Sequence, residues 1–288
     1  MVSLPCAFLL FDMMRFIRRL GNALALSRAF PYAGAGGKGR LLQLLFLYAS
    51  PRKSFPRMSI VPLVRSAYNL PADDAFFERY AVATQGFEEL WQSKPRATKE
   101  DIEHFYQEHD KDIWRQAYLS CRQAEYKKKI LKAYHTLLAA GIDRDAPVLD
   151  YGGGAGVLVH YLAVKGFTAL DIADIPSQTL TFVRKTLSSS LRNIIAVDGN
   201  ENLGQQSYAA IVSLDCLEHT MEPLAIAKRL LAALKPGGLF VLNFPKETDF
   251  STTHTREAQV ERDQVFAYLQ EHCHCLCPFY AYRKRRHP

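Results

Sequence analysis

The chain has 288 residues, of which 48% are hydrophobic and 23% are charged, and these proportions are typical of a globular protein with a substantial core. The formal net charge of +7 is unevenly distributed, because residues 1–70 contain ten Lys and Arg side chains and a single acidic residue, Asp12. The rest of the chain carries 26 basic and 28 acidic side chains. This near balance gives no electrostatic reason to expect nucleic-acid binding by the folded part.

The amino-terminal segment, residues 1–70, has an Arg-rich composition that is almost free of acids. Its apolar stretches, residues 4–14 and 41–49, are too short to span a bilayer. Such a segment is typical of an organelle-targeting leader or of a basic segment in peripheral contact with a membrane. A disordered stretch, or a true start at Met58, fits equally well. We expect a cytoplasmic protein, with organelle targeting through residues 1–57 as the alternative.

Residues 147–166 predict a strand, a tight loop and a helix. A short apolar run ends at Asp150, a glycine cluster follows, and apolar residues then recur at helical spacing. Glycines at Gly152, Gly154 and Gly156 allow the backbone to approach a ligand closely, and the free N–H groups of the following helix point to the same place. We therefore expect a nucleotide-like ligand at this loop, although a purely structural glycine turn has the same local pattern.

The spacing of the glycines distinguishes two kinds of nucleotide loop. A dinucleotide-binding loop would have its third glycine at position 157, where this chain has Val157. The pattern acid-x-Gly-x-Gly-x-Gly instead resembles motif I of the class I S-adenosylmethionine-dependent methyltransferases. The resemblance implies a Rossmann-like, doubly wound α/β fold with a mostly parallel sheet, and S-adenosylmethionine as the cofactor. It also implies that the loop shapes the site of the methionine part, through Asp150, Gly152, Gly153, Gly154 and Gly156.

Residues 71–141 predict a helical cap that ends at Gly141. Thr98 and Asp101 have the spacing of a capping box at the start of one of its helices. In the family that the glycine loop resembles, such helices lie over the cofactor and shape the acceptor pocket. Aromatic residues of the cap are therefore candidates for acceptor contacts, or simply for packing between helices: Phe105, Tyr106, Trp114 and Tyr118.

Two further acids follow predicted strands. Asp174 ends the strand predicted over residues 168–174, at the sheet edge where open α/β folds bind ligands. The resemblance implies that Asp174 binds the ribose hydroxyls and that Ile175 belongs to the same cofactor motif. It also implies that Asp198, followed by Gly199, binds the adenine amino group after the third strand. Asp171 is a rival for the ribose role, but it lies before the end of its strand.

A fourth predicted strand, from Tyr208, leads into Leu214, Asp215 and a Leu-Glu-His sequence ending at His219. This stretch resembles the corresponding strand and signature of small-molecule methyltransferases, including the quinone-biosynthesis O-methyltransferases. The resemblance implies that Leu214 and Asp215 contact the cofactor and that the residues up to His219 face the acceptor. A histidine that titrates near neutrality suits removal of the acceptor's proton, so His219 and His254 are the candidate bases. His219 could also have a structural role.

The carboxyl-terminal part predicts a helix over residues 257–271 and an extended stretch over residues 273–284. So few extended residues leave room only for a shortened hairpin, and the resulting sheet edge could be covered by a second copy of the chain. Residues 272–277 alternate His and Cys before Leu276. Alternation in a strand would put the three cysteines on one face, and we expect them to act as small apolar residues with no metal bound.

The sequence thus predicts three parts, a leader or disordered segment over residues 1–70, a helical cap over residues 71–141 and a cofactor-binding domain over residues 142–288. The expected activity is methyl transfer from S-adenosylmethionine to an oxygen, nitrogen or carbon of a small molecule by in-line displacement. The alternative is a non-catalytic, methyltransferase-like regulatory or assembly subunit.

Overall fold

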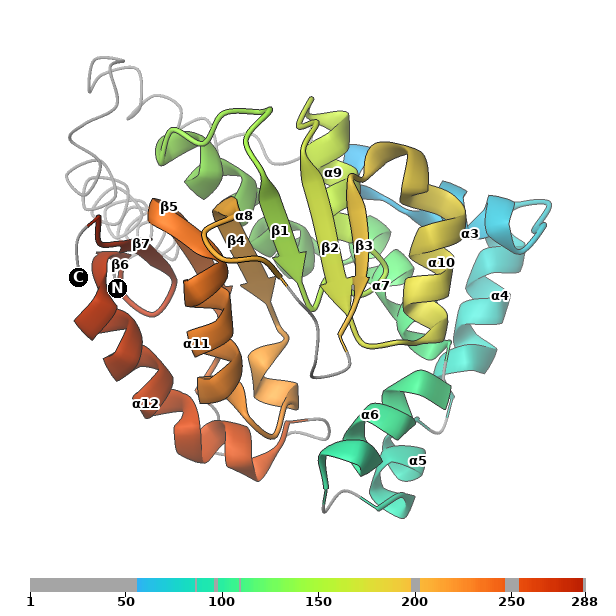
Figure 1. Cartoon of the computed structure of the whole chain (residues 1–288). Helices are drawn as coiled ribbons and strands as arrows, with labels where there is room; N and C mark the ends of the chain where they lie inside the picture. The colour runs from blue at the N-terminus through green and yellow to red at the C-terminus, as the bar shows by residue number, and fades with distance from the viewer. Residues whose placement is uncertain are drawn as a thin grey trace, which may run out of the picture.

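The computed structural model describes residues 56–85, 87–95, 98–108, 110–197, 203–246 and 254–286. Its centre is a seven-stranded sheet with the order β3-β2-β1-β4-β5-β7-β6 (Figure 1). The strands from β1 to β5 pair in parallel, and β7 pairs antiparallel with both β5 and β6. The strands are β1 Val148–Tyr151, β2 Leu170–Asp174, β3 Asn193–Ala196, β4 Tyr208–Leu214, β5 Leu234–Asn243, β6 Cys273–Cys277 and β7 Ala281–Lys284. The predicted mostly parallel α/β fold is confirmed, and its final hairpin has both strands.

Helices cover both faces of the sheet, because alternate residues of the buried strands point to opposite sides. Val148 packs with α3, α7, α8 and α9 on one face, and Leu149 packs with α11 and α12 on the other. The α-helices are α3 Val61–Ala67, α4 Asp73–Thr84, α5 Phe87–Ser93, α6 Lys99–Glu108, α7 Lys111–Arg122, α8 Ala124–Ala139, α9 Val157–Val164, α10 Gln178–Leu187, α11 Pro223–Ala233 and α12 Arg256–His272. Short 3₁₀ turns are η2 Pro56–Met58, η3 Ser188–Ser190 and η4 Leu217–His219.

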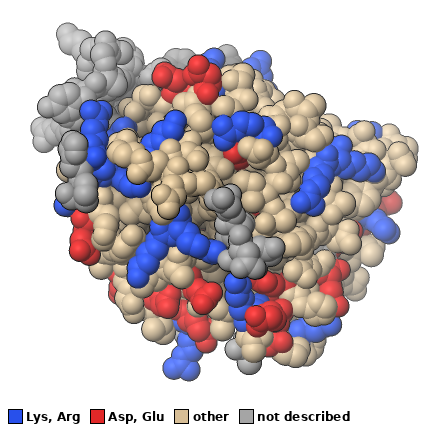
Figure 2. Space-filling model, in the orientation of Figure 1, with Lys and Arg blue, Asp and Glu red and all other residues tan. Residues whose placement is uncertain are grey.

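The first described residues belong to the folded unit. Met58, Ile60 and Val64 have no exposed surface and pack into the core beside α7 and α9. Residues 56–70 are thus folded, whereas the sequence placed them in a leader or disordered segment, and residues 1–55 lie outside the described residues. Among the helices that the structure describes, none combines the length and apolar character needed to cross a membrane. Basic and acidic side chains are interspersed over the face in Figure 2, in keeping with the near balance of charge after residue 70.

The helices α5 and α6 form a small unit at the carboxyl edge of the sheet, below β2 and β3 in Figure 1. They have their own apolar cluster of Trp91, Ile102 and Phe105, separate from the two main cores. The predicted capping box is confirmed, since the Thr98 N–H donates to Asp101 Oδ2 at 3.1 Å and the Asp101 N–H donates to Thr98 Oγ1 at 3.1 Å.

The three cysteines of β6 do not share one face, so that prediction is wrong. Cys273 is buried in the core beside α12, whereas Cys277 packs against the core on the opposite face and Cys275 is exposed. The cause is an irregularity in the pairing of β6 with β7 between Cys275 and Cys277, which interrupts the alternation of the strand.

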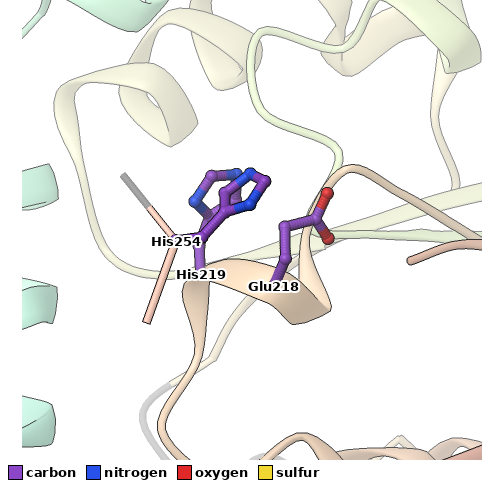
Figure 3. A group of neighbouring side chains, drawn as sticks. All are labelled: Glu218, His219 and His254. Atoms are coloured by element: carbon purple, nitrogen blue, oxygen red, sulfur yellow. The ribbon is translucent and has the colours of Figure 1, made fainter. Parts of the chain in front are cut away.

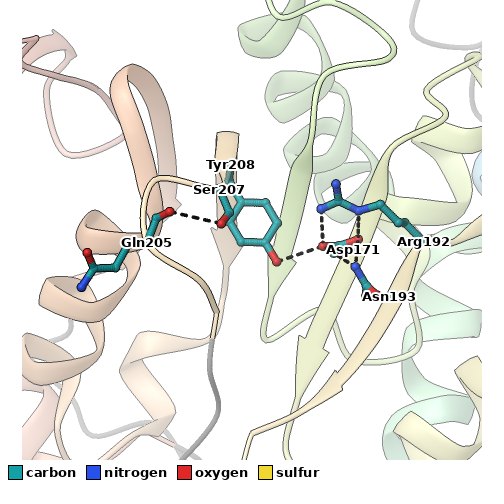
Figure 4. A network of polar contacts seen from close by, with 6 residues as sticks. All are labelled: Asp171, Arg192, Asn193, Gln205, Ser207 and Tyr208. Atoms are coloured by element: carbon teal, nitrogen blue, oxygen red, sulfur yellow. Dashed lines mark hydrogen bonds and ion pairs between the residues drawn. The ribbon is translucent and has the colours of Figure 1, made fainter.

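Asp171, the rival for the ribose role, is a structural residue. Its side chain is fully buried at the start of β2, and its carboxylate accepts hydrogen bonds from Arg192 Nε at 2.9 Å, from Arg192 Nη2 at 2.6 Å and from the Tyr208 hydroxyl at 2.9 Å (Figure 4). Asn193 Nδ2 also donates to it. A buried carboxylate with this many donors ties β2, β3 and β4 together and is not available to a ligand.

Replacing Asp171 with Ala should lower the free energy of unfolding by about 2–4 kcal/mol, because the hydroxyl of Tyr208 and the guanidinium of Arg192 lose their buried acceptor. Urea denaturation measures the change. The control is Asp73→Ala, which removes the exposed ion pair of Asp73 with Arg65 at 2.7 Å and should cost less than about 1 kcal/mol. Equal losses in the two variants would contradict the structural role of Asp171.

Candidate functional site

A cavity of about 440 Å³ opens at the carboxyl edge of the sheet, where the chain leaves β1 and β4 in opposite directions. Its volume is in the range of small-molecule sites. One wall comes from the glycine loop after β1 and the end of β2, and another from η4 and the start of α11. The cap helices α4, α6 and α7 close the remaining side.

The glycine loop depends on backbone conformations that favour glycine. Gly152, Gly154 and Gly156 have φ angles of 71°, 54° and 77°. A Cβ atom at Gly152 would lie 2.2 Å from Cys216 Sγ, and one at Gly154 would lie 2.2 Å from Gln116 Nε2. Because Gly152 and Gly154 have no side chains, Cys216 and Gln116 can pack against the loop, and a ligand can approach its backbone.

Gln116, on α7, is a site residue that sequence reasoning missed. Its Oε1 accepts a hydrogen bond from the Ala155 N–H at 2.9 Å, and its side chain lines the cavity beside Gly154. The contact joins the helical cap to the glycine loop across 39 positions of sequence. No local pattern marks Gln116, because a polar residue on an amphipathic helix is ordinarily solvated.

Asp174 fastens the glycine loop to the end of β2. Its Oδ2 accepts from the Gly154 N–H at 2.6 Å, and its Oδ1 accepts from the Ile175 N–H at 2.7 Å. Each carboxylate oxygen retains a lone pair that can accept a further hydrogen bond from a ligand hydroxyl. Burial raises the pKa of Asp174 to about 6, although the two backbone donors act in the opposite direction and the charge of Asp112 adds to the rise.

Asp150 lies behind the loop at the end of β1, with only 3% of its surface exposed. Its Oδ2 has no hydrogen-bond partner among the described residues. Burial, with a smaller effect from the charge of Asp174, raises the pKa of Asp150 to about 8. Two neighbouring carboxyl groups favour a positively charged ligand when they are ionised, and S-adenosylmethionine carries both a sulfonium and an ammonium group. The residues present thus fit the cofactor that the sequence predicts.

The other predicted cofactor residues are divided by the structure. Ile175 and Asp215 line the cavity together with Gly152, Gly154 and Asp174. Asp198 and Gly199 lie outside the described residues, although Val197 just before them lines the cavity. Four of the predicted cofactor residues that the structure describes do not line the cavity: Asp150, Gly153, Gly156 and Leu214. A Cβ atom at Gly153 would collide with Ile172, and one at Gly156 would collide with Leu187, so these two glycines permit close packing.

The carboxylate of Asp215 is held by the protein itself. Lys129 Nζ lies 2.6 Å from Asp215 Oδ2, and Asn243 Nδ2 donates to Asp215 Oδ1. The backbone of Asp215 has a φ of 50°, a conformation that non-glycine residues seldom adopt. This strained turn directs the chain from β4 into η4 beside the cavity.

Three side chains meet at η4, beside the cavity. Glu218, His219 and His254 place one nitrogen or oxygen atom each within 4.8 Å of one another (Figure 3). His219 lines the cavity and His254 does not. The ring of His254 packs against the ring of His219, with the two centroids 4.8 Å apart. The Tyr106 hydroxyl on α6 lies 3.4 Å from His219 Nδ1. The group can transfer a proton, and a carboxylate with two imidazoles is also a donor set for a divalent cation.

Comparison with known proteins identifies a family and several similar chains. A family model described as a methyltransferase domain matches residues 118–280. The ubiquinone biosynthesis O-methyltransferase of Xanthomonas campestris pv. campestris (strain B100) is 35% identical over 103 residues, which cover 34% of this chain and 42% of that protein. The protein of the same name from Idiomarina loihiensis is 36% identical over 97 residues, which cover 32% of this chain and 39% of that protein. The chain thus spans about two-fifths of the length of the curated relatives it matches.

Among solved structures, an S-adenosylmethionine dependent methyltransferase from Mesorhizobium loti is similar, with a TM-score of 0.33 and 21% identity. The match covers 38% of this chain and 52% of that one.

Replacing Asp150 with Asn should stabilise the ligand-free protein increasingly as the pH rises. The pKa of Asp150 is about 8 in the folded chain and about 3.9 in an unfolded one, so the folded state binds the proton more tightly. The parent protein therefore loses stability between about pH 4 and about pH 8, by at most about 1.4 kcal/mol per pH unit from this group. Urea denaturation at several pH values measures the difference.

The matched control is Asp145→Asn, in the exposed loop before β1. It should leave the dependence of stability on pH unchanged. A constant difference between Asp150→Asn and the parent protein across this pH range would contradict a buried carboxyl group with a raised pKa.

Proposed function

The chain belongs to the methyltransferase-domain family, whose model matches more than half of it, and we propose that it transfers the methyl group of S-adenosylmethionine to an oxygen of a small-molecule acceptor. One observation carries the proposal. The glycine loop, Asp174 and His219 line the same cavity, so the predicted cofactor residues and the candidate base border one space. The names of the two relatives, both ubiquinone biosynthesis O-methyltransferases, support oxygen as the acceptor atom.

The cofactor would be held at the carboxyl ends of β1, β2 and β3. Asp174 would accept the ribose hydroxyls through its remaining lone pairs, while Ile175 and Val197 offer apolar surface to the adenine ring. Asp150 and Asp174, when ionised, would favour the cationic methionine part, and Asp198 stays the predicted partner of the adenine amino group. S-adenosylmethionine supplies an electrophilic methyl group, so the protein's task is to align the acceptor and exclude water.

The acceptor would lie between η4 and the cap helices. Ile102, Met221 and Ile226 line this part of the cavity and suit an acceptor with an apolar body. As the acceptor oxygen gains the methyl group, it must release its proton. His219 is the candidate base because it lines the cavity, and His254 stands behind it as a second imidazole.

The non-catalytic alternative has less support. The glycines of the loop and Asp174 are retained, together with the hydrogen bond that joins them. A subunit that no longer bound a cofactor would gain nothing from a buried carboxyl group at Asp150 and a partly buried one at Asp174, both with raised pKa values. Contact with a membrane through residues 1–57 and association with a second copy stay predictions.

Isothermal titration with S-adenosylmethionine tests the cofactor site. We expect micromolar binding by the intact protein and at least about tenfold weaker binding by Asp174→Ala, which loses both the ribose acceptor and the tie to the loop. Binding should tighten and release protons as the pH rises from about 6 to about 8, because the cation favours the ionised forms of carboxyl groups whose pKa values lie there.

The control for this titration is Asp263→Ala, which removes an exposed carboxylate on α12 and should bind as the parent does. S-adenosylhomocysteine, which lacks the sulfonium charge, should show a weaker dependence on pH. Absence of binding by the folded, intact protein would overturn the proposed function.

Turnover of phenols with apolar substituents tests the acceptor side. His219→Gln should lower kcat by on the order of 10²-fold and change the Kd for S-adenosylmethionine by less than about threefold, since a general base contributes to the chemical step and not to cofactor binding. His254→Gln should have a smaller effect.

His274→Gln, on the exposed edge strand, is the control and should retain full activity. Turnover that is lost in EDTA and restored by a divalent cation would assign the three-residue group to metal binding in place of proton transfer. Unchanged turnover in the double variant of His219 and His254 would place the base elsewhere.

A further inference from the structure

His219 and His254 reach the acceptor side from separate segments of the chain. His219 ends η4 after strand β4, and His254 precedes α12 after strand β5. The two rings nevertheless pack edge to face, at an interplanar angle of 72°. Some contact must hold these segments in register, because each lies outside the hydrogen bonding of the sheet.

Thr255, the neighbour of His254, makes that contact. Its backbone N–H donates to the Glu218 carbonyl at 3.0 Å, and its hydroxyl Oγ1 donates to the Thr220 carbonyl at 2.7 Å. These two carbonyls belong to the residues on either side of His219. One residue therefore holds the backbone before and after the candidate base, while its own neighbour supplies the second imidazole.

The same hydroxyl caps the N-terminus of α12. Thr255 Oγ1 accepts a hydrogen bond from the Ala258 N–H at 3.1 Å, in the manner of a helix N-cap. A hydroxyl can donate one hydrogen bond and accept another at the same time, so both contacts are satisfied together. Only 5% of the surface of Thr255 is exposed, and water therefore competes little for either bond.

The helix that Thr255 begins is itself fixed to the neighbouring elements. Glu261 Oε2 accepts from the Leu224 N–H at 3.1 Å, which ties α12 to the start of α11. Arg262 Nε donates to the Phe244 carbonyl at 3.0 Å, which ties it to the end of β5. Because α12 is anchored on both sides, the contacts of Thr255 position η4 against a rigid element.

We propose that Thr255 is a positioning residue for methyl transfer, which keeps His219 aimed into the cavity and His254 packed behind it. The proposal rests on the proposed function, since it concerns the candidate base of that reaction. Thr255 does not line the cavity, so its effect on the acceptor must pass through the residues that it holds. Errors of about 1 Å in the placement of reacting groups are sufficient to reduce a rate by about 10²-fold.

The test compares Thr255→Val, which keeps the branched shape and removes the hydroxyl, with Thr255→Ser, which keeps the hydroxyl. We expect Thr255→Val to lower kcat at least about tenfold. The Kd and the KM for S-adenosylmethionine should change by less than about twofold, because the glycine loop and Asp174 lie at the ends of β1 and β2, whereas Thr255 holds the backbone around η4. Thr255→Ser should restore most of the activity.

The matched control is Thr136→Val on α8. Thr136 is also buried, and its hydroxyl donates to the Lys132 carbonyl of the same helix at 2.7 Å. Thr136→Val therefore removes a buried hydroxyl hydrogen bond by the same substitution, but Thr136 makes no hydrogen bond to η4. Thermal unfolding of both variants shows whether their folded states are retained, and we expect full activity in Thr136→Val.

A second readout does not require turnover. Nuclear magnetic resonance of the imidazole nitrogens should show the signals of His219 and His254 shifted in Thr255→Val and restored in Thr255→Ser. These shifts would appear even if the chain transferred no methyl group, so failure of the proposed function and failure of the positioning role are distinguishable. Unchanged imidazole signals in Thr255→Val, or equal losses in the Val and Ser variants, would overturn the proposal.

Discussion

The site depends on the hydrogen bond between the Asp174 carboxylate and the Gly154 N–H. Between β1 and α9 the chain passes through three glycines with positive φ, and such a loop has no repeating hydrogen bonds of its own to define its course. Asp174, on the adjacent strand, accepts from the Gly154 N–H, the neighbouring Ala173 carbonyl accepts from the Gly152 N–H at 2.8 Å, and Gln116 accepts from the Ala155 N–H on the side of the cap. The cofactor loop is thereby placed relative to both the sheet and the cap.

The two carboxyl groups near the glycine loop, Asp150 and Asp174, lower the stability of the fold but suit the binding of a cation. Asp150 is buried and Asp174 is partly buried beside it at the cavity, and the pKa of each is raised chiefly by desolvation. A fold selected for stability alone would place an apolar or neutral side chain at Asp150. A buried acid whose Oδ2 has no partner among the described residues suits a site whose ligand is a cation, since the ligand's charge offsets the desolvation of the carboxylate.

The two halves of the cavity are built in different ways. The cofactor half is made of strand ends whose spacing the parallel sheet determines. The half proposed for the acceptor is lined by α6, η4 and the start of α11, none of which pairs with a strand, so side-chain contacts define its geometry. Tyr106 reaches His219 from the cap, and Thr255 holds the backbone on either side of His219.

The sequence by itself determined the order of strands and helices, the glycine loop, the role of Asp174 as the acid at the end of β2 and the capping box at Thr98, because each is a pattern of neighbouring residues with a local physical cause. Only the tertiary structure decided that Asp171 is a structural acid, that Gln116 touches the glycine loop and that Thr255 joins His254 to His219. These contacts connect segments between 21 and 39 positions apart. Hydrogen bonds between such distant residues form only when the packed sheet and helices bring them together, and they leave no periodic trace in the chain.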